Sequence, residues 1–287
     1  MSRKSQTTKF GLTAYQLKVI ALLAMTIYHL ATYGNEIPVL NDYGSKLKIL
    51  GCFAAPLFLF TVTESIRYTR NRKKYLLRLY LGAVGVGLFV TVTNILFENS
   101  IGRFINNNIL FTYLYTALYI ILIEEISIAV KCKKVDRLLL CVAGIFATCI
   151  VHFLYQFLDK NVIISLQARD LVESFIVSPL YVDYSIAFVI LGVLIYFSKN
   201  KYWKASVLLC FSVLCGNTQI IESFSFIPFI SYYMGPAQRY MIFAIPFILL
   251  YSGDKGKDQK WLFYAYYPIH RYVISIVVYI FQYFGVT

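Results

Sequence analysis

Residues 17–34 read LKVIALLAMTIYHLATYG, a run of eighteen positions in which the only charged or imidazole side chains are Lys18 and His29. A helix of about 20 apolar residues crosses a hydrocarbon core of roughly 30 Å. Comparable runs recur through the 287-residue chain, which is 59% hydrophobic and 14% charged, with a mean hydropathy of +0.65. Soluble domains carry about 25% charged residues. The composition therefore predicts an all-α, polytopic transmembrane helical bundle and excludes a soluble globular domain, a disordered chain and a disulfide scaffold.

The apolar runs predict about nine spans (eight to ten) within a single integral membrane domain over residues 1–287. The predicted spans cover residues 17–34, 49–68, 76–97, 109–130, 138–158, 181–198, 204–221, 238–252 and 261–284. Prolines lie in and around the eighth, so we expect that segment to be broken or partly re-entrant. The connection near residues 159–180 is expected to hold a short interfacial helix.

The distribution of basic residues sets the predicted orientation. The chain has 27 Lys and Arg against 14 Asp and Glu, a formal net charge of +13. Most of the basic residues fall in the N-terminal segment and in every second connection, namely 67–78, 131–137, 199–204 and 255–260. Cytoplasmic loops carry such an excess, so the N-terminus is predicted to be cytoplasmic. The excess of basic residues is then explained by the orientation of the chain in a lipid bilayer, and no nucleic-acid partner is expected.

Lys18 and His29 form the sharpest candidate site. They are eleven residues apart, which is about 16 Å of helical rise and nearly the same helix face. A cation at the cytoplasmic end and an imidazole deep along the same face suit a long anionic acyl donor such as coenzyme A, and imidazole is the favoured general base. The alternative is that Lys18 extends to the interface and His29 bonds to a neighbouring helix; both interpretations remain open.

A basic turn between the second and third spans is the second candidate. Its Arg and Lys side chains can neutralise phosphates, or they can simply anchor the cytoplasmic side. The candidate cofactor ligands are Lys18, Arg67, Arg70, Lys73, Lys74 and Arg78. Glu64 stands near the same end and is expected to pair with Arg67 or Lys18.

Other buried ionisable groups are functional hypotheses because charge is costly inside a bilayer. His152, in the fifth span, is expected to be a packing residue. Arg271, in the ninth span beside His270, needs a partner or a water-filled cavity. Glycines in the third span, at 82, 85 and 87, are attributed to close helix crossings. No metal site is expected from the sequence.

Short motifs spread along the chain carry a family resemblance. They are Leu17-Lys18, Met25-Thr-Ile-Tyr28-His29, Ala55-Pro56-Leu-Phe, Glu64, Arg67-Tyr-Thr-Arg70-Asn71, Tyr75-Leu-Leu-Arg78, Asn108-Ile-Leu-Phe111-Thr112, Gln238, Leu250-Tyr251-Ser252-Gly253 and Tyr266-Tyr267-Pro268-Ile-His270. With these motifs the chain resembles the TraX family of bacterial membrane proteins, whose founding activity is N-terminal acetylation of a conjugative pilin. The spacing of Lys18 and His29 is also similar to the basic-x10-His signature of the related acyltransferase type 3 family.

The resemblance implies specific roles. His29 would be the catalytic histidine, and Lys18 with Arg78 would contact the phosphates of acetyl-CoA bound from the cytoplasm. Glu64, Gln238, His270 and Arg271 would be supporting residues, and the location would be the bacterial cytoplasmic membrane. The chain departs from the family pattern in three places. Tyr28 stands directly before the histidine where Asp is usual, and Ser252 stands where Asn is common. In the third span, Gly87-Leu-Phe-Val-Thr91 replaces an expected Glu-Ile-Pro-like stretch.

Together these observations predict an acetyl-CoA-dependent membrane acyltransferase. His29 would deprotonate an amine or hydroxyl of an exported peptide N-terminus or a cell-surface glycan, or would carry the acetyl group itself. Two other classes of protein stay open: a small transporter or channel with histidines along its path, and a non-catalytic assembly or sensor protein. Inverted repeats, which many transporters show, are not visible in the sequence.

Overall fold

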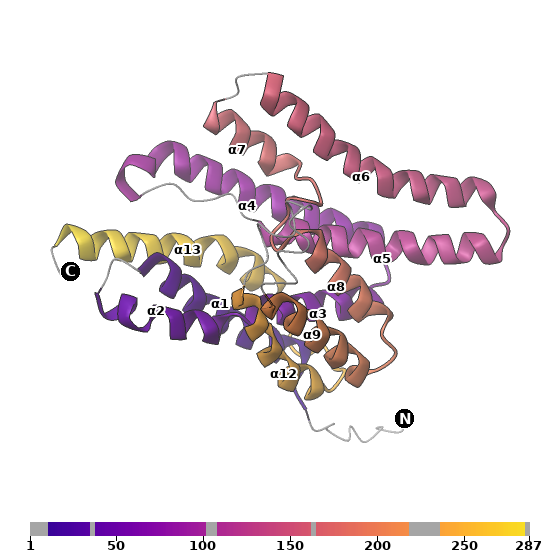
Figure 1. The fold of residues 1–287 in the computed structure, drawn as a ribbon, viewed down its shortest axis with the longest axis horizontal. Helices are drawn as coiled ribbons and strands as arrows, with labels where there is room; N and C mark the ends of the chain where they lie inside the picture. The colour runs from indigo at the N-terminus through magenta and orange to yellow at the C-terminus, as the bar shows by residue number, and fades with distance from the viewer. Residues whose placement is uncertain (1–10, 35–37, 102–107, 162–164, 218–235, 285–287) are drawn as a thin grey trace, which may run out of the picture.

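The computed structural model describes residues 11–34, 38–101, 108–161, 165–217 and 236–284, and in these residues the fold is all-α, as predicted (Figure 1). The helices are α1 (Ala14–Tyr33), α2 (Pro38–Gly51), α3 (Ala54–Tyr68), α4 (Arg72–Ile101), α5 (Ile109–Lys131), α6 (Val135–Asn161), α7 (Leu166–Phe175), α8 (Ser185–Phe197), α9 (Lys201–Gly216), the 3₁₀ helix η2 (Pro236–Ala244), α12 (Ile245–Leu249) and α13 (Lys260–Tyr283).

Five helical segments are long and apolar enough to cross a membrane: Ala14–Tyr33, Asp42–Tyr68, Arg72–Leu96, Ile109–Lys131 and Val135–Phe153. They coincide with the first five predicted spans, so the chain is a multi-pass membrane protein. Two further apolar helices, Ser185–Phe197 and Ala237–Leu249, are shorter. The count of nine spans and the orientation of the bundle stay predictions.

Helix α3 occupies the centre of the bundle. Its Leu57, Leu59 and Phe60 are almost fully buried and pack in one cluster with residues of α1, α5, α8 and α9, such as Leu17 and Phe188. Helix α6 lies at the outer edge beside α5 (Figure 1). Most of the apolar surface of α6 is exposed, as expected for a helix that faces lipid.

A turn at Cys52–Phe53 separates α2 from α3 within the second predicted span. Gly51, just before the turn, lies against α1: a Cβ added there would be 2.4 Å from the Cβ of Tyr28 and 2.7 Å from the backbone oxygen of Ala24. Only glycine lets the two helices approach this closely. The contact holds the end of α2 against α1 at Tyr28, the residue before His29.

The short helix expected near residues 159–180 is α7, and it packs on α4. The hydroxyls of Thr91 and Ser174 are 3.0 Å apart, and the Asn94 amide donates to Asp170 at 3.2 Å. A Cβ at Gly87 would lie 2.7 Å from Ser174 Cα. The close helix crossing predicted for the glycines of the third span is therefore confirmed at position 87. It is wrong at position 85, where an added Cβ would meet nothing within 4 Å.

The eighth predicted span is broken, as expected. Residues 236–244 form a 3₁₀ helix, and the five-residue α12 follows with Pro246 in its first turn. Proline lacks the N–H that an α-helical interior needs, which accounts for the change of helix type. The end of the seventh predicted span, 218–221, lies outside the described residues.

Candidate functional site

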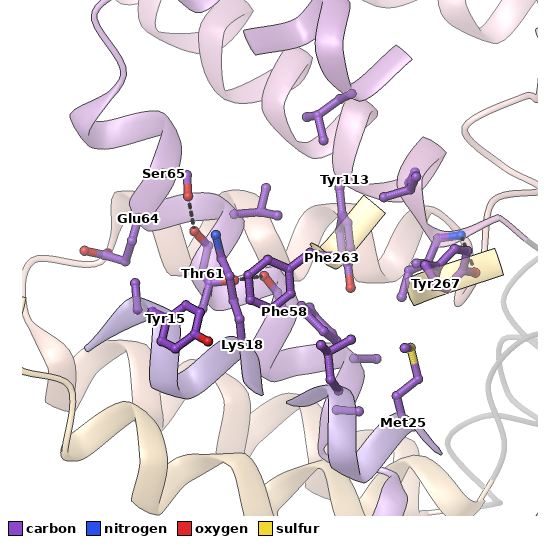
Figure 2. Close-up of a pocket in the computed structure, with 18 of the residues that line it drawn as sticks. Tyr15, Lys18, Met25, Phe58, Thr61, Glu64, Ser65, Tyr113, Phe263 and Tyr267 are labelled. Atoms are coloured by element: carbon purple, nitrogen blue, oxygen red, sulfur yellow. Dashed lines mark hydrogen bonds between the residues drawn. The ribbon is translucent and has the colours of Figure 1, made fainter. Parts of the chain in front are cut away.

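A cavity of about 1100 Å³ opens between α1, α3, α5, α13 and the connection that precedes α13. Its volume is slightly above the roughly 300–1,000 Å³ of typical small-molecule sites. Tyr15, Lys18 and Glu64 lie towards one end, and Tyr267 and Met25 lie towards the other (Figure 2). The cavity is therefore elongated along α1 and large enough for a nucleotide-sized ligand.

One end of the cavity is basic and open to solvent. Lys18, Arg78, Lys255 and Lys257 line it, and the last three are exposed. Asp258 pairs with Lys255 at 2.8 Å, which leaves a net positive mouth. Phosphate groups are the anions that such a cluster of Lys and Arg side chains binds best.

The mouth is built by a clasp, which we define as the pairing of residues 11–15 with residues 250–256. The amide of Leu12 donates to the Leu250 oxygen at 2.8 Å, and the amide of Ser252 donates to the Leu12 oxygen at 2.9 Å. Two amides of the first turn of α1, those of Ala14 and Tyr15, donate to the oxygens of residues 254 and 255. Helix starts leave four amides unsatisfied, so the clasp caps α1 and holds two lysines beside it.

We predict that Gly256→Ala loosens the clasp. Gly256 has φ +70°, and a Cβ there would lie 2.6 Å from the Thr13 hydroxyl oxygen, so the substitution adds a clash to a left-handed strain of about 1–2 kcal/mol. Gly253→Ala is the matched control, because Gly253 has φ +88° but open space around it. The thermal unfolding temperature of detergent-solubilised protein should fall further for Gly256→Ala; equal falls would mean that the contact with Thr13 is unimportant.

The opposite end of the cavity is deep and rich in hydroxyl groups. Tyr113, Tyr267 and Arg271 line it and are 4%, 9% and 7% exposed, and His29 and Asp183 border it as half-buried residues. The Tyr113 hydroxyl is buried and has no hydrogen-bond partner among the described residues. An unsatisfied buried polar group costs about 1–3 kcal/mol, so this hydroxyl is a donor kept available for a ligand.

Arg271 has both a partner and a cavity, as an arginine inside a membrane requires. Its Nε and Nη2 donate to the Tyr33 hydroxyl at 3.0 and 2.8 Å. Its charge interacts with that of Asp183 across the deep end. The deep end therefore brings a guanidinium and a carboxyl group into electrostatic range of each other, next to His29.

His29 lies in a group of aromatic rings at this end. Its ring centroid is 5.7 Å from that of Tyr28, 5.8 Å from Tyr33 and 5.1 Å from His270. The Nδ1 atom of His29 is buried without a hydrogen-bond partner among the described residues. Both Lys18 and His29 line the cavity, as the spacing along one helix face predicted.

The cavity collects only part of the predicted site. Lys18, His29, Glu64, Arg78 and Arg271 line it, whereas its lining does not include Arg67, Arg70, Lys73, Lys74, Gln238 or His270. His270 contacts the ring of His29 but does not line the cavity, and Gln238 is on η2. His152 sits on α6 against Tyr181, away from the cavity.

Glu64 differs from expectation in its main partner. It pairs with Lys204 of α9, and both side chains are buried. Of the two expected partners, Arg67 is 3.9 Å away. The Arg67 guanidinium instead donates a hydrogen bond to the Tyr196 carbonyl oxygen and lies 4.7 Å from the centroid of the Tyr196 ring.

Among the lining residues that the sequence did not single out as site residues, four carry polar groups used below: Asp183, Tyr113, Lys255 and Lys257. Asp183 falls within the predicted span 181–198, and the two lysines fall in the basic connection 255–260 that was used to predict the orientation. No local motif marks these positions, because each is brought to the cavity by contacts between distant segments.

Comparison with known proteins gives one match. The family model described as TraX protein matches residues 13–278, which include the whole of the cavity lining. No curated protein and no solved structure matches. Because the match covers nearly all of the chain, the resemblance seen in the motifs is confirmed: the chain belongs to the TraX protein family.

Proposed function

We propose that the chain is a membrane acyltransferase that moves an acetyl group from cytoplasmic acetyl-CoA to an amine or hydroxyl of an exported or cell-surface acceptor. The acceptor would be a peptide N-terminus or a glycan. TraX is associated with acetylation of F-pilin, which supports acetyl transfer as the reaction class.

The observation that carries the proposal is the shape and charge of the cavity. Lys18 and His29 both line it and are eleven residues apart on α1, about 16 Å along the axis. Coenzyme A has phosphates at one end and a thioester at the end of a thin pantetheine arm. A basic mouth joined to a deep imidazole matches this distribution, whereas a small ion would need neither the length nor the volume.

The chemistry follows from the groups at the deep end. His29 accepts the proton of the attacking amine or hydroxyl, whose nitrogen or oxygen then bonds to the thioester carbonyl carbon. The bond from that carbon to sulfur breaks when the tetrahedral intermediate collapses, and protonated His29 gives its proton to the sulfur, which leaves as the thiol of coenzyme A. The free Tyr113 hydroxyl is a suitable donor to the developing oxyanion, a contribution that removes several kcal/mol from such barriers.

Thiol release is the direct test. Purified protein in detergent, given acetyl-CoA and a peptide or sugar acceptor, should release free coenzyme A and yield acetylated acceptor. Neither release nor binding of acetyl-CoA by calorimetry would overturn the proposal and favour a transporter or a sensor. Binding without turnover would mean that the acceptors tried are not substrates.

We predict that Lys255→Ala/Lys257→Ala weakens coenzyme A binding by about tenfold or more, because each charge-assisted hydrogen bond contributes about 1.5–3 kcal/mol. The matched control is Lys73→Ala/Lys74→Ala, which removes two exposed positive charges from residues outside the cavity lining. Calorimetry at two salt concentrations gives both affinities. If the control weakens binding as much as the test variant, the phosphates are bound by the basic turn instead.

A further inference from the structure

His29 and His270 form a pair of imidazoles that joins α1 to α13. Their centroids are 5.1 Å apart and their planes are inclined by 52°. Each ring has one buried nitrogen without a hydrogen-bond partner among the described residues, Nδ1 of His29 and Nε2 of His270. Buried polar atoms are nearly always paired, so two unpaired nitrogens on neighbouring rings call for an explanation.

The backbone determines the tautomer of His270. Its Nδ1 lies 2.8 Å from the carbonyl oxygen of Tyr266, one turn earlier in α13. A carbonyl oxygen only accepts, so Nδ1 carries the proton. In a neutral imidazole the other nitrogen is then an acceptor, and Nε2 of His270 is the atom with the lone pair.

This acceptor has a matching donor nearby. If Nδ1 of His29 carries a proton, its partner can be Nε2 of His270, and Nε2 of His29 becomes the basic atom at the cavity. The nitrogens are not at hydrogen-bond distance in this structure. Catalytic hydrogen bonds are often long without substrate and tighten in the substrate complex, and this bond forms once a ring rotation brings the two nitrogens together.

A carboxylate usually supplies this support for a catalytic imidazole. Here the residue before His29 is Tyr28, and no carboxylate forms an ion pair with either imidazole in the part of the chain that the structure describes. Asp183 interacts with Arg271 instead. The second imidazole therefore occupies the place that an orienting acid would take.

We propose that His270 is a positioning residue, which accepts a hydrogen bond from Nδ1–H of His29 and holds Nε2 of His29 as the base. This inference rests on the proposed acetyl transfer. In this chain of hydrogen bonds, Nδ1–H of His270 donates to the Tyr266 carbonyl oxygen, and Nδ1–H of His29 donates to Nε2 of His270. Nε2 of His29 then accepts the proton of the nucleophile. The backbone of α13 thus sets the tautomer of a residue on α1.

Two near-isosteric variants separate positioning from packing. In His270→Gln the amide oxygen reaches the place of Nε2 and can accept from His29. In His270→Asn the amide reaches only the place of Nδ1 and keeps the Tyr266 contact alone. We expect kcat to fall about 10–100-fold for Asn, the scale found when the hydrogen-bonding partner of a metal-bound imidazole is removed. Coenzyme A affinity should stay unchanged, and Gln should recover most of the activity. Equal losses in both variants would overturn the proposal.

A second readout does not depend on turnover. The chain has three histidines, so ¹⁵N-histidine NMR of the detergent-solubilised protein, assigned with His152→Gln, can report each tautomer. We expect protonated Nδ1 in both His29 and His270. A His29 protonated at Nε2 overturns the inference, whereas the expected tautomers without any acetyl transfer support the pair and overturn the proposed function alone.

Discussion

His29→Gln should lower acetyl transfer by about 10²–10⁴-fold, the usual contribution of a positioned general base, while coenzyme A still binds. His29 borders the deep end of the cavity and the basic mouth lies about 16 Å away along α1. Loss of the imidazole removes the proton acceptor and leaves the phosphate contacts intact. Thiol release and calorimetry on the same preparation measure the two effects separately.

The control for this variant is His152→Gln, which changes a histidine outside the cavity lining. It should retain wild-type turnover. Normal turnover by His29→Gln would contradict a catalytic role for His29. If radiolabelled acetyl-CoA without acceptor leaves an acetyl group on the wild-type protein but not on His29→Gln, His29 is an acyl carrier instead of a general base.

Lys204→Met should destabilise the protein by about 3–5 kcal/mol, the typical cost of breaking a buried ion pair from one side. Lys204 and Glu64 are 8% and 5% exposed and lie on α9 and α3. Methionine preserves most of the volume, so the loss comes from leaving the Glu64 carboxylate buried with only the more distant Arg67. Thermal unfolding in detergent measures the change.

Two further variants show whether the charge is responsible. Lys199→Met removes an exposed lysine from the same connection and should change little. Lys204→Met/Glu64→Leu removes both charges and should recover much of the lost stability, because replacement of a whole buried pair is often neutral. A double variant as unstable as the single one would mean that Lys204 acts through packing.

The sequence was sufficient for the features that depend on one helix. Eleven residues are close to three turns of a helix, so Lys18 and His29 had to share a face, and both line the cavity. The same holds for the broken eighth segment, since Pro246 lacks the amide hydrogen that an α-helix continuing from residues 236–244 would need.

Features that depend on contacts between distant segments could not be predicted. Lys204 is 140 residues from Glu64, and no periodicity indicates that α9 packs beside α3. The charge rule assigns Lys255 and Lys257 to a side of the membrane, but only the clasp brings them to the mouth. The place of Asp183 at the deep end of the cavity likewise depends on packing near Arg271, which is 88 positions later in the chain.

The clasp also has a consequence for biosynthesis. Its two halves, such as Leu12 and Ser252, are 240 positions apart, and chains fold from the N-terminus as they are made. The first helix enters the bilayer long before its capping carbonyls have been translated. A nascent chain that ends before residue 250 can contain His29, Lys18 and the basic turn and still lack the donor mouth. If the chain binds acetyl-CoA as proposed, it can do so only after the segment from residue 250 onwards has been translated.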